Sequence, residues 1–93
     1  MELCYNFAMV IKYGSEPDPA RRIRIRQGEN IRKARVLRGM TPAELAEAVG
    51  VTVSAISQWE TGRYSPRQHH QLAICRALDV AHSFVFGLDV VPA

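Results

Sequence analysis

The chain has only two cysteines, no long apolar run and few acidic residues in its middle part. Cys4 and Cys75 are too few and too far apart to form a disulfide framework. No stretch approaches the roughly 18 consecutive apolar residues of a membrane-spanning helix, so we expect no membrane partner. The first residues contain no basic region, and we predict no secretory signal peptide. A chain of 93 residues suffices for one small core, and we expect a cytoplasmic protein.

Residue patterns that support catalysis or metal binding are also missing. His69 and His70 are adjacent, so on a helix they point about 100° apart, and His82 and Cys75 lack the i, i+4 spacing of a zinc site. Cys75 could pair with a histidine as a nucleophile, but its apolar neighbours favour an inert buried thiol. There is no glycine-rich phosphate loop. We therefore predict no enzyme activity, no metal and no cofactor.

The positive charge is concentrated in the middle of the chain. Residues 1–20 carry a net charge of −2 and residues 71–93 carry −1, whereas residues 21–70 have ten basic and four acidic side chains. Eight of the basic residues lie between positions 21 and 38. Such a block attracts a polyanion because binding releases condensed counterions. The alternative is a solvated helix face that follows a charged tail.

The N-terminal segment has a different pattern. Apolar and aromatic side chains occupy alternate positions in residues 3–13, which predicts a β-strand. Residues 14–19 contain one glycine and two prolines and are typical of a linker. We therefore divide the chain into an extension, 1–20, and a domain, 21–93. The strand needs a partner, either residues 88–91 or the same strand of a second chain.

Helical spacing of apolar residues begins near residue 27. The first helix is predicted at about 28–38, with Ile31, Ala34 and Leu37 at its apolar positions. Thr41, Pro42 and Glu44 form a capping box on a proline start, which predicts a second helix over 42–48. Three more helices are expected, of which one begins after the Thr52 cap, one follows Ser65-Pro66, and a short one contains Phe84 and Val85.

The second and third predicted helices are joined by Gly50-Val51-Thr52. Two short helices with a three- to four-residue turn that contains glycine are typical of a helix-turn-helix, whose second helix enters the DNA major groove. Ala46 would allow the two helices to approach closely, and Val51 and Ile56 would fill the corner. An ordinary αα-hairpin in a small bundle would have the same spacing.

Residues 28–46, 49–63 and Pro66 resemble the phage-repressor (lambda-repressor-like, Cro/CI or XRE-type) helix-turn-helix regulators, with Ile56-Ser57-Gln58-Trp59-Glu60-Thr61-Gly62 as the most specific run. The resemblance extends over about 27–88. The resemblance implies a mainly α, five-helix fold that binds double-stranded DNA as a dimer. The alternating pattern of residues 3–13 adds an N-terminal β-strand extension to this expected fold. The resemblance also implies a buried ion pair between Arg35 and Glu60, and Leu45, Val49, Leu72 and Leu78 are expected in the core with Trp59.

The third helix would present its N-terminal residues to the bases, with Ile56 and Trp59 turned inward. The candidate base contacts are Val53, Ser54, Ser57 and Gln58. The candidate backbone contacts around the same helices are Thr41, Pro42, Ala43, Thr52, Thr61 and Arg63. The family commonly has a phosphate-binding glutamine where this chain has Pro42, so the amide of Ala43 or Glu44 takes over that contact or the contact is lost.

Arg21, Arg22, Arg24 and Arg26 precede the first predicted helix. We predict a basic arm over 21–26 that contacts the DNA backbone, since such arms reach a groove in other DNA-binding proteins. The alternative is that Ile23 and Ile25 pack while the arginines are solvated.

Two functions remain open. The first is a sequence-specific transcriptional regulator, expected to be a repressor that binds a pseudo-palindromic operator as a homodimer. The dimer would form through the N-terminal strand or through the fifth helix with Phe84, Phe86 and Leu88. The second is an antitoxin or protein-interaction module whose residues 3–13 bind a protein partner, because a helix-turn-helix fold alone does not prove DNA binding.

Overall fold

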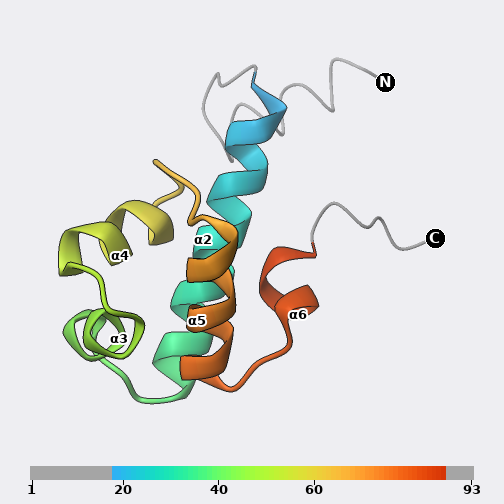
Figure 1. Ribbon diagram of the computed structural model, residues 1–93. Coiled ribbons are helices and arrows are strands. Elements are labelled where there is room, and N and C mark those ends of the chain that lie inside the picture. The colour runs from blue at the N-terminus through green and yellow to red at the C-terminus, as the bar shows by residue number, and fades with distance from the viewer. Residues whose placement is uncertain (1–17, 88–93) are drawn as a thin grey trace.

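The computed structural model describes residues 18–87, which form five helices arranged around one core (Figure 1). The helices are α2 (Pro19–Leu37), α3 (Pro42–Val49), α4 (Val53–Glu60), α5 (Gln68–Leu78) and α6 (His82–Phe86). Helices α3 and α4 pack against each other on one side of α2, α5 lies alongside α2, and α6 closes the opposite side. None of the described helices is long and apolar enough to cross a membrane. The mainly helical fold class is confirmed.

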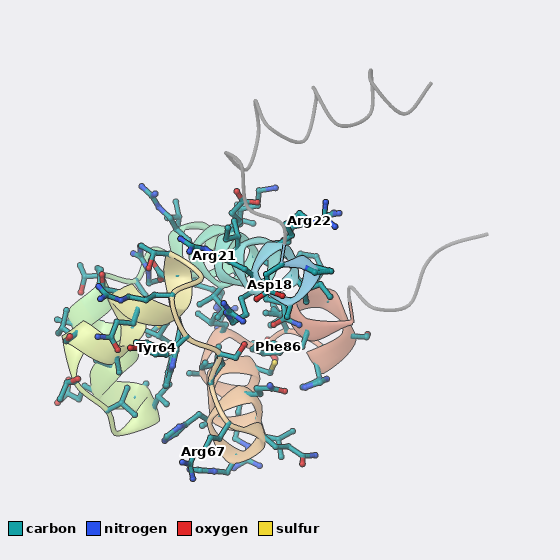
Figure 2. The ribbon with its side chains drawn as sticks, turned by 90° about the horizontal axis from the view of Figure 1, so that it is seen from above. Asp18, Arg21, Arg22, Tyr64, Arg67 and Phe86 are labelled. Carbon is teal, nitrogen blue, oxygen red and sulfur yellow. The ribbon has the colours of Figure 1, made fainter. Side chains whose placement is uncertain are left out.

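The first helix begins nine residues earlier than the predicted start at residue 28, so that expectation was wrong. Asp18 is the N-cap and its Oδ1 accepts a hydrogen bond from the amide of Ala20 at 3.0 Å. Pro19 occupies the first helical position, where its missing amide hydrogen costs nothing. Residues 21–26 therefore belong to α2 and do not form an arm that precedes the first helix. Figure 2 shows Asp18 and Arg22 at this end of the helix.

The other predicted helix boundaries are confirmed to within a residue or two. Thr41 and Glu44 form the predicted capping box, with Thr41 N–H donating to Glu44 Oε1 at 2.8 Å and Glu44 N–H donating to Thr41 Oγ1 at 3.1 Å. Thr52 Oγ1 accepts from the amide of Ala55 at 3.1 Å and so caps α4 as predicted. Short polar side chains at these caps supply acceptors that the first helical turn lacks.

The predicted N-terminal strand and its two possible partners lie outside the described residues. This applies to residues 3–13, to most of the expected linker and to residues 88–91. Within residues 18–87 the structure contains no strand. The division of the chain at residue 20 stays a prediction, and α2 crosses that position.

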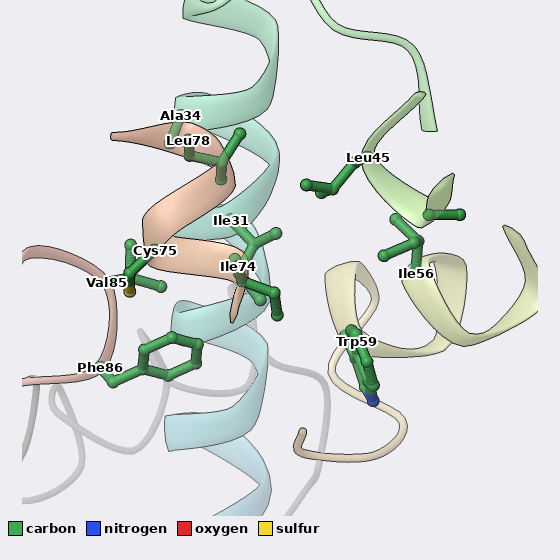
Figure 3. Packing of buried hydrophobic residues seen from close by; sticks show 11 residues of the cluster. Ile31, Ala34, Leu45, Ile56, Trp59, Ile74, Cys75, Leu78, Val85 and Phe86 are labelled. Atoms are coloured by element: carbon green, nitrogen blue, oxygen red, sulfur yellow. The ribbon is translucent and has the colours of Figure 1, made fainter. Parts of the chain in front are cut away.

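Every described helix contributes side chains to the core (Figure 3). The buried apolar residues are Ile31, Ala34, Leu45, Ala46, Ile56, Trp59, Ile74, Cys75, Leu78, Val85 and Phe86. The expected positions of Leu45, Trp59 and Leu78 in the core are confirmed, and Val49 and Val51 pack against its edge. Leu72 was expected there too, but it is 48% exposed. The core face of α5 is formed by Ile74, Cys75 and Leu78. Leu72 lies two positions before Ile74, about 200° around the helix, and therefore faces away from the core.

Arg35 and Glu60 form the ion pair that the family resemblance implied. Arg35 Nε donates to Glu60 Oε2 at 2.7 Å, and Arg35 Nη2 donates to Oε1 of the same carboxylate at 3.2 Å. Arg35 Nη1 donates to the Met40 carbonyl at 2.8 Å. Each of the two side chains is about 10% exposed. Loss of one partner would leave a buried charge, a change that typically costs about 3–5 kcal/mol.

Gly28 allows α2 to approach the end of α4 closely. A Cβ at Gly28 would lie 2.3 Å from the Trp59 carbonyl oxygen and 2.5 Å from that of Glu60. Both atoms are backbone, so a side chain cannot be accommodated by a rotamer change. Glycine is unfavourable in the middle of a 19-residue helix, and this contact explains its presence.

His70 is the first-turn residue of α5 that packs against α4. Its ring centroid lies 5.2 Å from that of Trp59 and 4.1 Å from that of His69. Desolvation lowers the pKa of His70, and the positive charges of His69 and Arg67 lower it further. A histidine whose pKa is lower in the folded chain than in the unfolded chain binds protons more readily on unfolding, so acid pH destabilises the fold.

We expect Gly28→Ala to lower the free energy of unfolding by about 1–3 kcal/mol because the new methyl group displaces α2 from α4. This would occur although alanine normally stabilises a helix interior by roughly 1 kcal/mol over glycine. Urea denaturation followed by circular dichroism measures the change. Glu29→Ala, at the neighbouring exposed position, is the control and should change stability by less than about 0.5 kcal/mol. A Gly28→Ala protein as stable as the wild type would contradict the close contact.

We also expect the melting temperature to fall as the pH drops below about 6.5, the ordinary pKa of histidine. The contribution of His70 to the free energy of unfolding is fully present above that pH. As the pH falls, this contribution decreases until the pH is below the lowered pKa of His70 in the folded chain. Thermal melts at about pH 7.5 and about pH 5.5 measure this decrease. It should be smaller in His70→Gln, which has no titrating ring. Equal decreases in the two proteins would show that His70 does not contribute.

Candidate nucleic-acid interface

Helices α3 and α4 form the predicted helix-turn-helix. Gly50 ends α3 with a φ of +85° and a ψ of 35°, a left-handed conformation that glycine adopts without steric cost. Ala46, buried between the helices, accepts hydrogen bonds from the amides of Gly50 and Val51 at 2.8 and 3.0 Å. Ile56 is fully buried in the corner and Val51 packs beside it. The turn therefore directs the first residues of α4 outward.

The four candidate base contacts lie on one helix and differ in exposure. Val53 is 48% exposed, and Ser54 and Ser57 are exposed as well. Gln58 is half-buried. Ile56 and Trp59 face the core, as predicted. The exposed face of α4 is thus uncharged up to its last residue, Glu60, which is paired with Arg35, and it combines the apolar Val53 with two serines.

A groove of about 380 Å³ runs between α2, the start of α3 and α4. Its lining residues are Arg32, Arg35, Pro42, Val53, Ser57, Glu60 and Thr61. The sequence prediction placed Arg32 in the basic block but did not select it as a site residue. Arg32 lies on the same face of α2 as Gly28 and Arg35, but its place beside α4 depends on how the two helices pack, which the helical pattern alone does not give.

The N-terminus of α3 offers one open amide in place of the missing glutamine. Pro42 has no N–H, and the amides of Glu44 and Leu45 donate to Thr41 Oγ1 and to the Thr41 carbonyl. Within the described residues the amide of Ala43 has no hydrogen-bond partner. Of the two amides considered from the sequence, only that of Ala43 is therefore free to bind an anion, and the helix dipole favours one there.

Thr41, Thr52 and Thr61 differ in whether the hydroxyl hydrogen is free to be donated to a phosphate. Thr41 Oγ1 and Thr52 Oγ1 both accept bonds from amides in their capping roles, so their hydroxyl hydrogens remain free to be donated to a phosphate. Thr61 Oγ1 already donates to the Ser57 carbonyl at 2.9 Å, with the Gln58 carbonyl at 3.3 Å. A phosphate oxygen only accepts, so Thr61 would have to break this bond to bind one.

The basic residues beyond α4 and at the start of α2 lie near one another. Arg24 Nε donates to the Gly62 carbonyl at 3.3 Å, and Arg63 is exposed in the loop that follows. A second cleft, of about 410 Å³, is lined by Arg21, Arg24, Thr61 and Arg63. In Figure 2 Arg21 lies on the side of α2 nearer the loop that contains Tyr64, and Arg22 lies on the other side.

The remaining reactive groups do not gather into a site within residues 18–87. The described part of the chain has no cluster of three or more histidine, cysteine or acidic side chains that could hold a metal ion. Burial raises the pKa of the Cys75 thiol, so this thiol is neutral at physiological pH. His82 Nε2 and Gln71 Oε1 are hydrogen-bonded at 2.8 Å, which links α6 to α5.

Comparisons with known proteins agree with this geometry. The family model described as "Helix-turn-helix" matches residues 31–85, more than half of the chain. An uncharacterized HTH-type transcriptional regulator from Methanothermobacter thermautotrophicus is 48% identical over 60 residues, which are 63% of this chain and 87% of the relative.

Solved structures of regulatory proteins are similar as well. The clp gene regulator ClgR from Corynebacterium glutamicum has a TM-score of 0.66 and 32% identity, over 68% of this chain and 67% of that one. The restriction-modification controller protein C.AhdI from Aeromonas hydrophila has a TM-score of 0.64 over 67% of this chain and 94% of that one, but at 24% identity it shows the fold alone. The chain belongs to the XRE-type helix-turn-helix family of transcriptional regulators.

Proposed function

We propose that this protein binds double-stranded DNA sequence-specifically and represses transcription. The observation that carries the proposal is the outward N-terminal face of α4. It is uncharged and exposed, Arg32 of α2 lines the groove beside it, and Arg63 is exposed in the loop that follows α4. An uncharged helix face with cations near it suits a major groove, whose base edges form hydrogen bonds and whose borders are phosphates.

The chemistry of the α4 face favours modest sequence discrimination. Gln58 would bond to adenine N6 and N7, a pairing worth about 1–3 kcal/mol against the wrong base. Ser54 and Ser57 accept several base partners, and Val53 packs against a thymine methyl group. The exposed part of α4 contains no arginine or lysine to read guanine. We infer that DNA shape and deformability supply the rest of the specificity.

The backbone contacts would hold α4 in register. Thr52 at the start of α4, and Thr41 with the Ala43 amide at the start of α3, donate hydrogen bonds to phosphates on one side of the groove. Pro42 shapes that helix start without contributing a donor of its own. Arg63 contacts the backbone beyond the other end of α4, together with Thr61 if its hydroxyl turns away from Ser57. These contacts position the protein and do not themselves select a sequence.

The proposal includes a homodimer on a pseudo-palindromic operator, acting in the cytoplasm. Phe84 is 56% exposed, whereas Phe86 is in the core, so a dimer formed through α6 would use Phe84. This corrects the expectation that both rings would be available there. Repression would follow from occupation of a promoter. The alternative, a module that binds a protein through residues 3–13, rests on a segment outside the described residues.

Selection from random DNA duplexes, with sequencing of the bound pool, tests the proposal. We expect an inverted repeat whose half-sites are separated by about one helical turn, 10–10.5 base pairs or a multiple of it. Gln58→Ala and Ser54→Ala should lower affinity for the selected sequence and relax the preference at single positions, because each removes a base contact. Direct binding measurements on the selected and on base-substituted duplexes quantify the loss.

Matched controls lie on other helices, away from the exposed face of α4. Ser83→Ala on α6 and Gln68→Ala on α5 change the same residue types at exposed positions and should leave binding unchanged. Enrichment of single half-sites would argue against the dimer. If no sequence is enriched and the protein does not bind DNA near physiological salt, the regulatory function is wrong and a protein partner becomes the better explanation.

A further inference from the structure

The N-terminal part of α2 lies outside the family match, which begins at residue 31. It nevertheless packs firmly on the loop after α4. A Cβ at Gly62, whose φ is +79°, would lie 2.6 Å from Ile25 Cα, and Arg24 Nε donates to the Gly62 carbonyl. The first turns of α2 are therefore held at a set position relative to α4.

This packing creates the cleft between Arg21, Arg24, Thr61 and Arg63. Three of its four lining residues are arginines and none is acidic. Arg21 also takes part in an interaction of its own. The Nε of Arg24 is used by the Gly62 carbonyl, while its two terminal nitrogens have no hydrogen-bond partner among the described residues. Arg63 is exposed beside them.

The cleft continues the surface that carries the candidate base contacts. Thr61 lines both this cleft and the groove that contains Val53 and Ser57. The cleft therefore lies beyond the C-terminal end of α4, on the same side of the protein. A DNA duplex with α4 in its major groove would bring the backbone at the border of that groove to this end of the helix.

We infer that Arg24 and Arg63 together hold one phosphodiester of the DNA backbone in this cleft. The inference rests on the proposed DNA binding and deepens it, because it assigns a contact that the helix-turn-helix alone does not provide. A guanidinium group presents two parallel N–H donors that match phosphate oxygens. Arg24 is already oriented by its bond to Gly62, so less conformational entropy is lost when the phosphate binds.

The four arginines of residues 21–26 then have different roles. On a helix, Arg22 and Arg26 lie about 100° and 140° around the axis from Arg21, away from the cleft. They contribute to the general positive field but do not touch the bound phosphate. Arg26 is exposed and provides a matched control for Arg24, since both lie in the same helical extension and carry the same charge.

The salt dependence of DNA binding tests this assignment. Each neutralised phosphate contributes about 0.9 to the slope of log K against log salt concentration. Because the two side chains share one phosphate, the double variant of Arg24→Gln and Arg63→Gln should reduce the slope by about 0.9, and each single variant should reduce it by less, since the remaining arginine still neutralises part of that charge. Arg26→Gln should leave the slope nearly unchanged. A loss in Arg26→Gln equal to that in Arg24→Gln would overturn the inference, as would a loss of about 1.8 in the double variant, which would mean two separate phosphates.

Neutral methylphosphonates placed one at a time in the selected duplex locate the contact. The wild type should bind more weakly when one particular phosphate in each half-site is neutral, Arg24→Gln should be less sensitive at that position, and the double variant of Arg24→Gln and Arg63→Gln should be insensitive there. Melting curves check that the variants are folded. Arg63→Gln is the second test if Arg24→Gln loosens the loop, because no described residue is hydrogen-bonded to the Arg63 side chain.

Inorganic phosphate at matched ionic strength separates a backbone contact from a site for a free anion. If phosphate alone saturates the cleft while no neutral substitution weakens DNA binding, the assignment to DNA is wrong. If the wild type does not bind DNA at all, the proposed DNA-binding function is wrong, and the Arg24–Arg63 phosphate contact is wrong with it. If binding still depends on Gln58 and Ser54 while the cleft variants behave like Arg26→Gln, only this inference fails.

Discussion

The contact between α2 and the C-terminal end of α4 determines how the rest of this domain is arranged. Gly28 brings the α2 backbone against the Trp59 and Glu60 carbonyls, and Arg35 binds the Glu60 carboxylate with two hydrogen bonds. Gly62 then allows the following loop to lie against Ile25. Close backbone packing and a buried ion pair restrict both the distance and the rotation of α4, so one end of α4 is anchored and the other projects outward.

For the proposed DNA binding, that arrangement would let different residues of one surface supply affinity and selectivity. The residues that project from α4 are uncharged, and the arginines come from α2 and from the loop after α4. In the proposed DNA complex, long-range attraction would arise from these charges near the borders of the groove, where phosphates would lie. The short polar side chains at the centre would form weaker, more selective hydrogen bonds with base edges. Arg35 is excluded from both roles because Glu60 and the Met40 carbonyl already satisfy its guanidinium group.

Local chemistry was sufficient to predict most of the helices and the helix-turn-helix itself. Thr41 and Thr52 were identified as caps because a hydroxyl acceptor at those positions satisfies open amides of the first helical turn. The start of α2 was misplaced because Asp18 and Pro19 also fit a linker. Only the hydrogen bond from Ala20 to Asp18 shows that they cap a helix. Leu72 was misplaced for a related reason, since an apolar residue on a helix does not reveal which face the neighbouring helices cover.

The sequence by itself determined the family, the caps, the turn between α3 and α4 and the outward face of α4. Each of these depends on residues that are close in sequence, where backbone geometry and periodicity leave few alternatives. Only the tertiary structure decided that Arg24 and Arg63 share a cleft and that Arg32 borders the α4 groove. These positions are brought together by the phase of α2 and its packing on α4, which depend on contacts between residues that are more than 30 positions apart in the chain.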